Sequence, residues 1–226
     1  MKQIFITACI ISATIISCTS NEKTDDATTV NSDTSVRASS DTGTMASTND
    51  GAYTPVDNAT MMKNWTAYST PGDMHAMMAK WNGTWKGKML MWHAPDTPPD
   101  SSTATAINKM IYGGRYQQST HVGDMMGMKF EGQNIMGYDN AKKVFQSTWM
   151  DNMGTGIMMM EGPWDDATKT LTMTGKMLDP SQGTAKEIMM RHVMRVVDDN
   201  HHVYEMYCNG PDGKEFKTME LAMARN

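Results

Sequence analysis

Hydrophobic and polar residues alternate along most of the chain from residue 84 onward. A period of two is typical of β-strands that bury one face. In residues 169–178, for example, Leu171, Met173 and Met177 fall on one face, and three threonines and a lysine fall on the other. The segments that this pattern predicts as strands are residues 84–92, 102–112, 115–122, 131–138, 143–150, 156–164, 169–178, 187–197, 202–208 and 215–225.

Short runs of turn-forming residues separate these segments. Residues 139–142 read Asp-Asn-Ala-Lys and residues 165–168 read Asp-Asp-Ala-Thr, while residues 198–200 and 210–213 are similarly rich in Asp, Asn and Gly. Such residues favour tight hairpins. A meander of ten hairpin-connected strands leaves two open edges unless it closes. The pattern therefore predicts an all-β fold, an up-and-down antiparallel meander closed into a barrel of roughly ten strands.

A short helix is predicted before the first strand. Thr70 can cap it, Pro71 suits the first helical position, and Gly83 marks its end. Apolar residues then recur at helical spacing rather than in alternation. These residues are Met74, Met77, Met78 and Trp81.

The first 17 residues have the pattern of an export signal. Lys2 gives an early positive charge, and residues 4–16 form a mostly apolar stretch that is too short to span a bilayer. Residues 15–18, Ile-Ile-Ser-Cys, resemble a bacterial lipobox. The resemblance implies cleavage before Cys18, acylation of its thiol and anchoring to a membrane through the acyl chains. An ordinary secretory signal that contains a cysteine is the alternative.

A polar segment follows the lipobox. Residues 18–60 are rich in Ser, Thr, Asp and Asn and nearly free of large apolar residues, so they cannot bury enough surface to fold. We expect three parts: a signal peptide over residues 1–17, an acylated Cys18 with a disordered tether over residues 18–60, and a barrel domain over residues 61–226. Some Gram-negative lipoproteins carry a retention aspartate where Thr19 stands. We therefore expect a cell-envelope protein, with the outer membrane favoured.

Composition narrows the classes of function. The formal net charge of −5 gives no basic footprint for nucleic acid. No spacing links a nucleophile to a base and an orienting group, so the residues favour a binding protein over an enzyme. If Cys18 is acylated, Cys208 has no disulfide partner.

The chain holds 27 methionines, and leucine occurs only at Leu90, Leu171, Leu178 and Leu221. Methionine therefore takes leucine's place in much of the core.

Two positions at opposite ends of the predicted barrel resemble the calycin group, which includes lipocalins and fatty-acid-binding proteins. Residues 83–85, Gly-Thr-Trp, resemble the Gly-x-Trp of the first calycin strand. Arg225 resembles the arginine of the last strand that packs across that tryptophan. First and last strands are neighbours in a closed meander, so a cation–π contact between Trp85 and Arg225 is expected.

The chain also resembles a bacterial family, domain of unknown function family 1579, over residues 74–226. The resemblance implies a calycin-like barrel and assigns no function, and the extra methionines and the polar tether depart from it. The motifs that carry it are Gly-Gly-Arg-Tyr at 113–116, Met-Met-Gly-Met at 125–128, Phe-Glu-Gly at 130–132, Gly-Tyr-Asp-Asn at 137–140, the segment 147–156, Glu-Met-Tyr at 205–207 and the segment 210–216.

A barrel of this size can hold a small molecule. Inward-facing thioethers would suit an apolar ligand, with polar contacts near the mouth. A filled barrel that acts as a protein-interaction module, for instance with another envelope protein, is the alternative. The candidate ligand-binding residues are Trp85, Met89, Tyr138, Trp149, Asp151, Asn152, Met190, His192 and Arg225.

No cofactor is required by this interpretation, but the many methionines also suggest binding of a copper ion. Thioether and imidazole groups are ligands that Cu(I) selects. Met89, Met91 and His93 lie together on one segment, and His75 with Met77 forms another cluster. Copper binding, or the scavenging of oxidants by exposed methionines, is therefore an alternative function. A haem held by His192 or by His121 is a further alternative.

Overall fold

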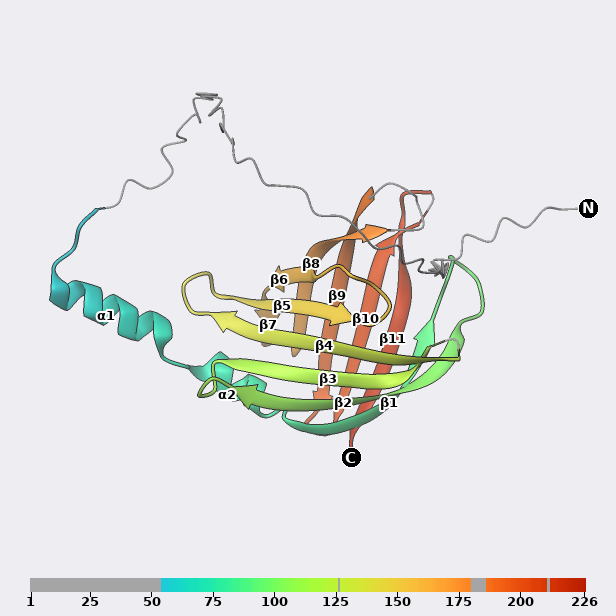
Figure 1. Cartoon of the computed structure of the whole chain (residues 1–226), viewed down its shortest axis with the longest axis horizontal. Coiled ribbons are helices and arrows are strands. Elements are labelled where there is room, and N and C mark those ends of the chain that lie inside the picture. Colours follow the sequence, from blue (N-terminus) through green and yellow to red (C-terminus); the bar gives the residue numbers. More distant parts are fainter. Residues whose placement is uncertain (1–53, 126, 180–185, 211) are drawn as a thin grey trace, which may run out of the picture.

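The computed structural model describes residues 54–125, 127–179, 186–210 and 212–226 (Figure 1). The predicted signal peptide, Cys18 and most of the predicted tether lie outside these residues. Two helices precede eleven strands. Their bounds are α1 Asn58–Ser69, α2 Asp73–Ala79, β1 Gly83–Met91, β2 Asp100–Ile111, β3 Tyr116–Met125, β4 Met128–Asp139, β5 Val144–Asp151, β6 Met158–Gly162, β7 Trp164–Asp165, β8 Thr170–Asp179, β9 Lys186–Asp198, β10 His201–Asn209 and β11 Glu215–Arg225.

Ten of the strands form a closed antiparallel barrel, which confirms the predicted fold. Each strand pairs with its neighbours in the chain, β1 pairs with β11, and β6 pairs with β8 to complete the ring. The predicted strand 156–164 divides into β6 and the two-residue β7. Pro163 stands at the division, and it lacks the N–H that a continuous ladder needs. A Cβ on Gly162 would lie 1.9 Å from the backbone oxygen of Thr172, so only glycine fits at this crossing.

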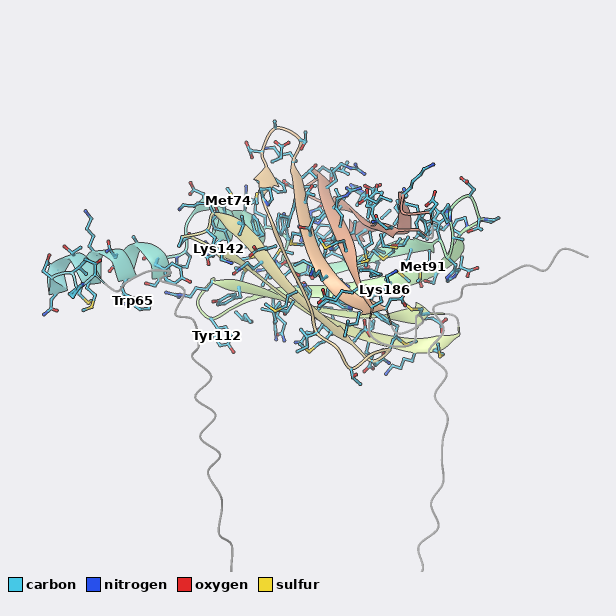
Figure 2. All side chains as sticks on the ribbon, turned by 90° about the horizontal axis from the view of Figure 1, so that it is seen from above. Trp65, Met74, Met91, Tyr112, Lys142 and Lys186 are labelled. Atoms are coloured by element: carbon cyan, nitrogen blue, oxygen red, sulfur yellow. The ribbon has the colours of Figure 1, made fainter. Side chains whose placement is uncertain are left out.

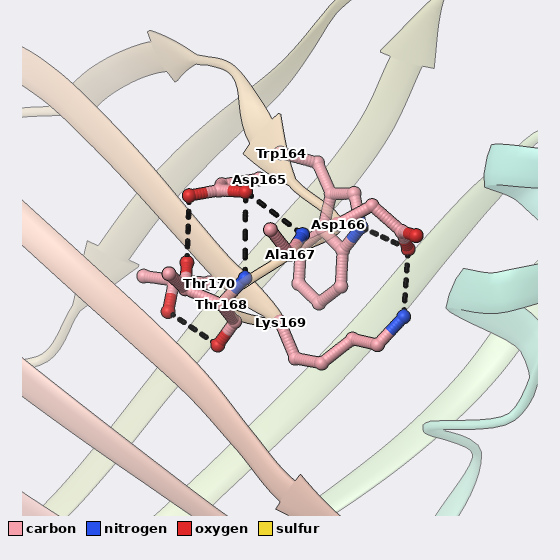
Figure 3. A network of polar contacts seen from close by, with 7 residues as sticks. All are labelled: Trp164, Asp165, Asp166, Ala167, Thr168, Lys169 and Thr170. Atoms are coloured by element: carbon pink, nitrogen blue, oxygen red, sulfur yellow. Dashed lines mark hydrogen bonds and ion pairs between the residues drawn. The ribbon is translucent and has the colours of Figure 1, made fainter.

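Two hairpins share the same turn chemistry. Asp139 accepts hydrogen bonds from the backbone N–H groups two and three residues further on, and Asp165 does the same. Each turn ends at a lysine in the left-handed region, Lys143 with φ of 61° and Lys169 with φ of 54°. Figure 3 shows the second turn, in which the Thr168 hydroxyl also donates to Asp165. The predicted turns are therefore present, with aspartate side chains in place of glycine-based geometry.

Helix α2 closes one end of the barrel. Met78 and Trp81 are buried there, and their backbone oxygens accept hydrogen bonds from inward side chains of the first three strands. The N-cap of the helix is Gly72 rather than the predicted Thr70. Thr70 instead ends α1, where its hydroxyl donates to the Thr66 backbone oxygen at 2.6 Å. The donors at the end of α2 are Trp85, Asn108 and Gln117.

Helix α1 was not predicted, and it includes the last residues of the predicted tether, 58–60. Asp57 caps it by accepting from the backbone N–H of Thr60. None of its side chains is buried, and it extends away from the barrel in two perpendicular views, with Trp65 on it (Figures 1 and 2). The side-chain amide of Asn140 donates to the backbone oxygens of Tyr68 and Thr70 and holds its end. Neither helix in the described part of the chain has the length and apolar character needed to cross a membrane.

Candidate ligand site in the open half of the barrel

Burial falls with distance from α2 along several strands, although Met190 on β9 remains buried. In β3, Gln117 is buried, whereas His121, four residues further along the strand and on the same face, keeps part of its surface exposed. In β8, Leu171 and Met173 are buried, whereas Met177 is partly exposed. We call the end that α2 closes the packed half and the other end the open half. The partly exposed inward residues of the open half are Met91, His121, Trp149, Met158, Met177, His192, Tyr204 and Met206.

The packed half is filled by side chains. Its core contains Trp81, Phe145, Leu171 and Met194, each at most 3% exposed, and a second cluster surrounds Trp85. Most of the buried residues in these clusters are methionines and aromatic residues, as expected from the scarcity of leucine. Buried side chains therefore pack the interior of this half, and the open half is where a small molecule would meet the interior.

His192 lies on the inner face of β9, at the floor of the open half. Burial lowers the pKa of its imidazole to about 4, so the ring is neutral near pH 7. Its Nε2 atom is buried and has no hydrogen-bond partner among the described residues. Its ring lies 6.0 Å, centroid to centroid, from the ring of Tyr204 on β10. An unpartnered buried nitrogen is rare in native proteins and usually has a functional or solvent partner.

His121 approaches the same space from β3. Burial lowers its pKa to about 4, and the charge of His192 contributes to the shift. Since β3 and β9 are not neighbours in the barrel, this interaction runs across the interior. The His121 ring lies 5.0 Å from Trp149, edge to face. The two imidazoles therefore lie on the inner faces of strands that are not neighbours in the barrel.

Trp149 forms part of the wall between them. Its indole N–H donates to Asp151 at 2.7 Å, which fixes the ring. A Cβ on Gly132 would lie 2.6 Å from that ring, so the glycine makes room for it. Phe130 stacks on the outer part of the indole at 6.2 Å. The Trp149 side chain is thus held rigidly, with its carboxylate partner already occupied.

Tyr204 contributes the third polar group. Burial raises the pKa of its phenol, so it remains protonated at any physiological pH. The ring contacts His192 and His202, and no hydrogen bond joins its hydroxyl to another described residue. His192 and Tyr204 are therefore adjacent polar groups on neighbouring strands, each with unused hydrogen-bonding capacity.

The structure separates the residues that the sequence suggested as ligand contacts. Trp149, Asp151 and His192 belong to the open half. Asn152 instead joins β5 to β4, because its side chain accepts from the Glu131 backbone and donates to the Lys129 backbone. Four others lie in or at the packed half: Trp85, Met89, Tyr138 and Arg225. Met190 lies beyond His192 on β9, where its side chain is buried in the first core cluster. Tyr204 was missed, although its inward position follows from the alternation in β10.

The copper candidates have other partners. His75 accepts a hydrogen bond from the Gly72 backbone at 3.1 Å and forms another with the Tyr138 backbone, and it is buried. Burial is the largest cause that lowers its pKa. His93 pairs with Asp100 at 3.0 Å on the surface. The remaining candidates are Met77, Met89 and Met91, which lie against the two core clusters. The described residues contain no cluster of three His, Cys, Asp or Glu side chains suited to a metal ion.

A separate groove of about 480 Å³ lies on the outer surface. It runs from the end of α1, at Tyr68, across the outward side chains of the neighbouring strands. Those side chains include Tyr116, Gln146 and Glu161. Since these positions point away from the interior, the groove is distinct from the open half.

The fold and this interior define a class of protein: a closed antiparallel β-barrel, plugged by a helix at one end and lined at the other by aromatic, thioether and imidazole groups. The chain belongs to the DUF1579 family of proteins of unknown function, whose pattern matches residues 70–225. The matched segment begins after α1 and contains the whole barrel. The family assignment predicted from the sequence is therefore confirmed.

One solved structure supports the fold class. The crystal structure of Rv2717c from M. tuberculosis is 8% identical, with a TM-score of 0.51 over 70% of this chain and 99% of that chain. At this identity the likeness concerns the fold alone. A redesigned β-barrel is 13% identical, with a TM-score of 0.33 over 66% of this chain and 94% of that chain. No curated protein matches the sequence.

Proposed function

We propose that this protein is a lipid-anchored barrel of the cell envelope, calycin-like in design, that binds one small apolar molecule in its open half. The observation that carries the binding proposal is the gradient of burial along the strands. On β3 and β8, inward side chains are buried beside α2 and partly exposed further along the strand, at His121 and Met177, whereas on β9 Met190 remains buried beyond His192. A wall of thioether and aromatic groups suits an apolar ligand, because methionine adapts its shape at low cost.

Binding is tested with naphthalene, a small neutral probe, by equilibrium dialysis. We expect saturable binding with one site per barrel. Met177→Trp should abolish it, because the added ring would occupy the open half. Leu178→Trp is the matched control, since Leu178 is the next residue on β8 and points outward, where it is 54% exposed. Equal binding by both variants, or no saturable binding by the natural protein, would refute an interior site and favour a filled barrel.

The anchoring proposal rests on the sequence of residues 15–18. Cys18→Ser should release the protein from the membrane fraction when it is expressed in a Gram-negative host. Cys9→Ser is the control, because Cys9 lies within the apolar part of the signal and should leave anchoring unchanged. Continued membrane association of the Cys18 variant would refute acylation at that residue. Separation of inner from outer membranes tests the expected outer-membrane location.

We do not advance copper binding as a second function. Both imidazoles proposed for it have hydrogen-bond partners of their own, His75 in backbone contacts and His93 with Asp100. Binding of Cu(I) there would break these bonds before any gain from coordination.

A further inference from the structure

We propose that the open half is built for an uncharged, largely apolar molecule that carries one hydroxyl group, and that His192 and Tyr204 together bind that hydroxyl. This inference rests on the proposed ligand-binding function and adds the chemical class of the ligand. It assigns a binding role to two inward polar side chains that the barrel itself leaves without hydrogen bonds.

The first argument is the state of the two side chains in the protein. In the packed half, the amide nitrogens of Gln117 and Asn108 donate to backbone oxygens at the end of α2, although Asn108 Oδ1 and both nitrogens of His202 are also buried without a partner among the described residues. His192 has a buried nitrogen with no partner among the described residues, and it lies 6.0 Å from the Tyr204 ring. Burying such a group costs free energy unless something completes its hydrogen bond. A ligand in the open half would complete it.

The second argument is the type of group that fits. A neutral imidazole carries one donor and one acceptor nitrogen, and a phenol can donate or accept. A hydroxyl on the ligand can also do both, so it can pair with His192 in either tautomer and with Tyr204 at the same time. A carbonyl oxygen, which only accepts, can pair with both side chains only when His192 carries its proton on Nε2, whereas a hydroxyl fits both tautomers.

The third argument concerns charge. Asp151 is the carboxylate of this region, and it already accepts from the Trp149 indole N–H. The cations on the same strands point outward, where Arg191 pairs with Glu215 and Lys217 pairs with Glu220. The imidazoles of His121 and His192 are neutral near pH 7. A carboxylate ligand would therefore lose its hydration and meet no opposite charge among the described residues.

The fourth argument is the shape of the remaining wall. Trp149 is held by its hydrogen bond and by Phe130, and His121 presents a ring edge to it. Thioethers of Met177 and Met206 line the strands beside His192. Rigid aromatic faces combined with flexible thioethers accept a flat or compact apolar body.

Three related probes separate the parts of this inference. Naphthalene has the apolar body alone, 1-naphthol adds a hydroxyl, and 1-naphthoate adds a charged carboxylate. We expect the natural protein at pH 7 to bind 1-naphthol about tenfold more tightly than naphthalene, which corresponds to about 1.4 kcal/mol. We expect 1-naphthoate to bind at least tenfold more weakly than naphthalene, because its charge would be buried without a partner.

The decisive variant is His192→Leu. We expect it to remove the tenfold preference for 1-naphthol while leaving naphthalene affinity within about twofold. His201→Leu is the control, since His201 lies at the other end of the barrel and pairs with Asp198 at the surface. Tyr204→Phe, which removes only the hydroxyl, should lower the preference severalfold and provides the test if the leucine variant does not fold.

The outcomes distinguish the two proposals. Equal affinity for naphthalene and 1-naphthol, or a preference that survives in both the His192 and the Tyr204 variants, overturns hydroxyl recognition and leaves the apolar site standing. Binding of 1-naphthoate as tightly as 1-naphthol overturns the requirement for a neutral ligand. Absence of binding by all three probes refutes the proposed function itself.

Discussion

The guanidinium carbon of Arg225 lies 4.3 Å from the ring centroid of Trp85, and the two residues are paired in register on β11 and β1. Arg225 also donates to the backbone oxygens of Lys80, Asn82 and Asp199. One side chain therefore joins the first strand, the last strand, the end of α2 and the β9–β10 turn. It closes the packed half, which explains why it makes no contribution to the open half.

Replacing Arg225 should destabilise the barrel strongly. Arg225→Lys retains the charge but cannot reproduce the planar fork that reaches three backbone oxygens. We expect a loss of about 1–3 kcal/mol in the free energy of unfolding, measured by urea denaturation, because several hydrogen bonds and the stacking over Trp85 are lost together. Arg191→Lys is the comparison, since Arg191 also covers an aromatic ring, Tyr207, at 3.9 Å, but on the outer surface. A loss below about 1 kcal/mol is expected there; equal losses would contradict the special role of Arg225.

Replacing His192, unlike replacing Arg225, should not lower the stability of the barrel. Replacing a buried, unpaired polar side chain by an apolar one removes a penalty of about 1–3 kcal/mol. We therefore expect His192→Leu to leave stability unchanged or to raise it. Gln117→Leu is the matched inward substitution, and it should lower stability by about 1–3 kcal/mol, because the Met78 backbone oxygen loses its donor at 2.8 Å. Thermal unfolding monitored by circular dichroism gives both values. A destabilised leucine variant at residue 192 would mark His192 as a structural residue.

The sequence alone determines a large part of this architecture. Alternation and aspartate-rich turns locate every strand of the barrel, and the Gly-x-Trp motif with Arg225 predicts the contact between first and last strands. Alternation gives the face on which a side chain lies but not its depth in the barrel. Trp85 and Met89 are inward as predicted, yet they are buried in the packed half. Depth depends on where α2 inserts, which no local pattern encodes.

Two features could not be found from the sequence for separate reasons. Helix α1 buries no side chain, so its residues lack the apolar periodicity by which helices are identified. The electrostatic influence of His192 on His121 depends on closure of the barrel between β6 and β8, which makes strands distant in the sequence part of one ring. Such long-range juxtaposition follows from three-dimensional closure and leaves no trace in spacing.

Acidification should destabilise the barrel through its buried imidazoles. Burial first, and then the charge of Arg225, lower the pKa of His202 to about 4, and burial lowers the pKa of His121 and His192 to similar values. The unfolded chain has imidazoles with pKa near 6.5. Between these values the unfolded state binds more protons, so stability is fully present above pH 6.5 and is lost as pH falls towards 4.

The contribution of His202 can be isolated by substitution. Its ring is 1% exposed and stacks on Trp85 at 4.2 Å, and its carboxylate neighbours Asp198 and Asp199 only partly oppose the shift. His202→Phe preserves the stacking and removes the titration. We expect the loss of stability between pH 6.5 and 4 to shrink by an amount on the order of 3 kcal/mol. Urea denaturation at a series of pH values measures it, and an unchanged pH profile would contradict a neutral buried imidazole.

The two aspartate-capped hairpins allow a prediction about backbone strain. Lys143 and Lys169 both have positive φ, which costs a residue with a Cβ about 1 kcal/mol relative to glycine. Lys143→Gly should therefore raise the free energy of unfolding, by roughly 0.5 kcal/mol after the greater flexibility of unfolded glycine is counted. Lys169→Gly should gain less, because the Lys169 ammonium also pairs with Asp166 at 2.8 Å (Figure 3). Chemical denaturation of both variants checks the order. A larger gain at residue 169 than at residue 143 would show that this surface pair contributes nothing to the turn.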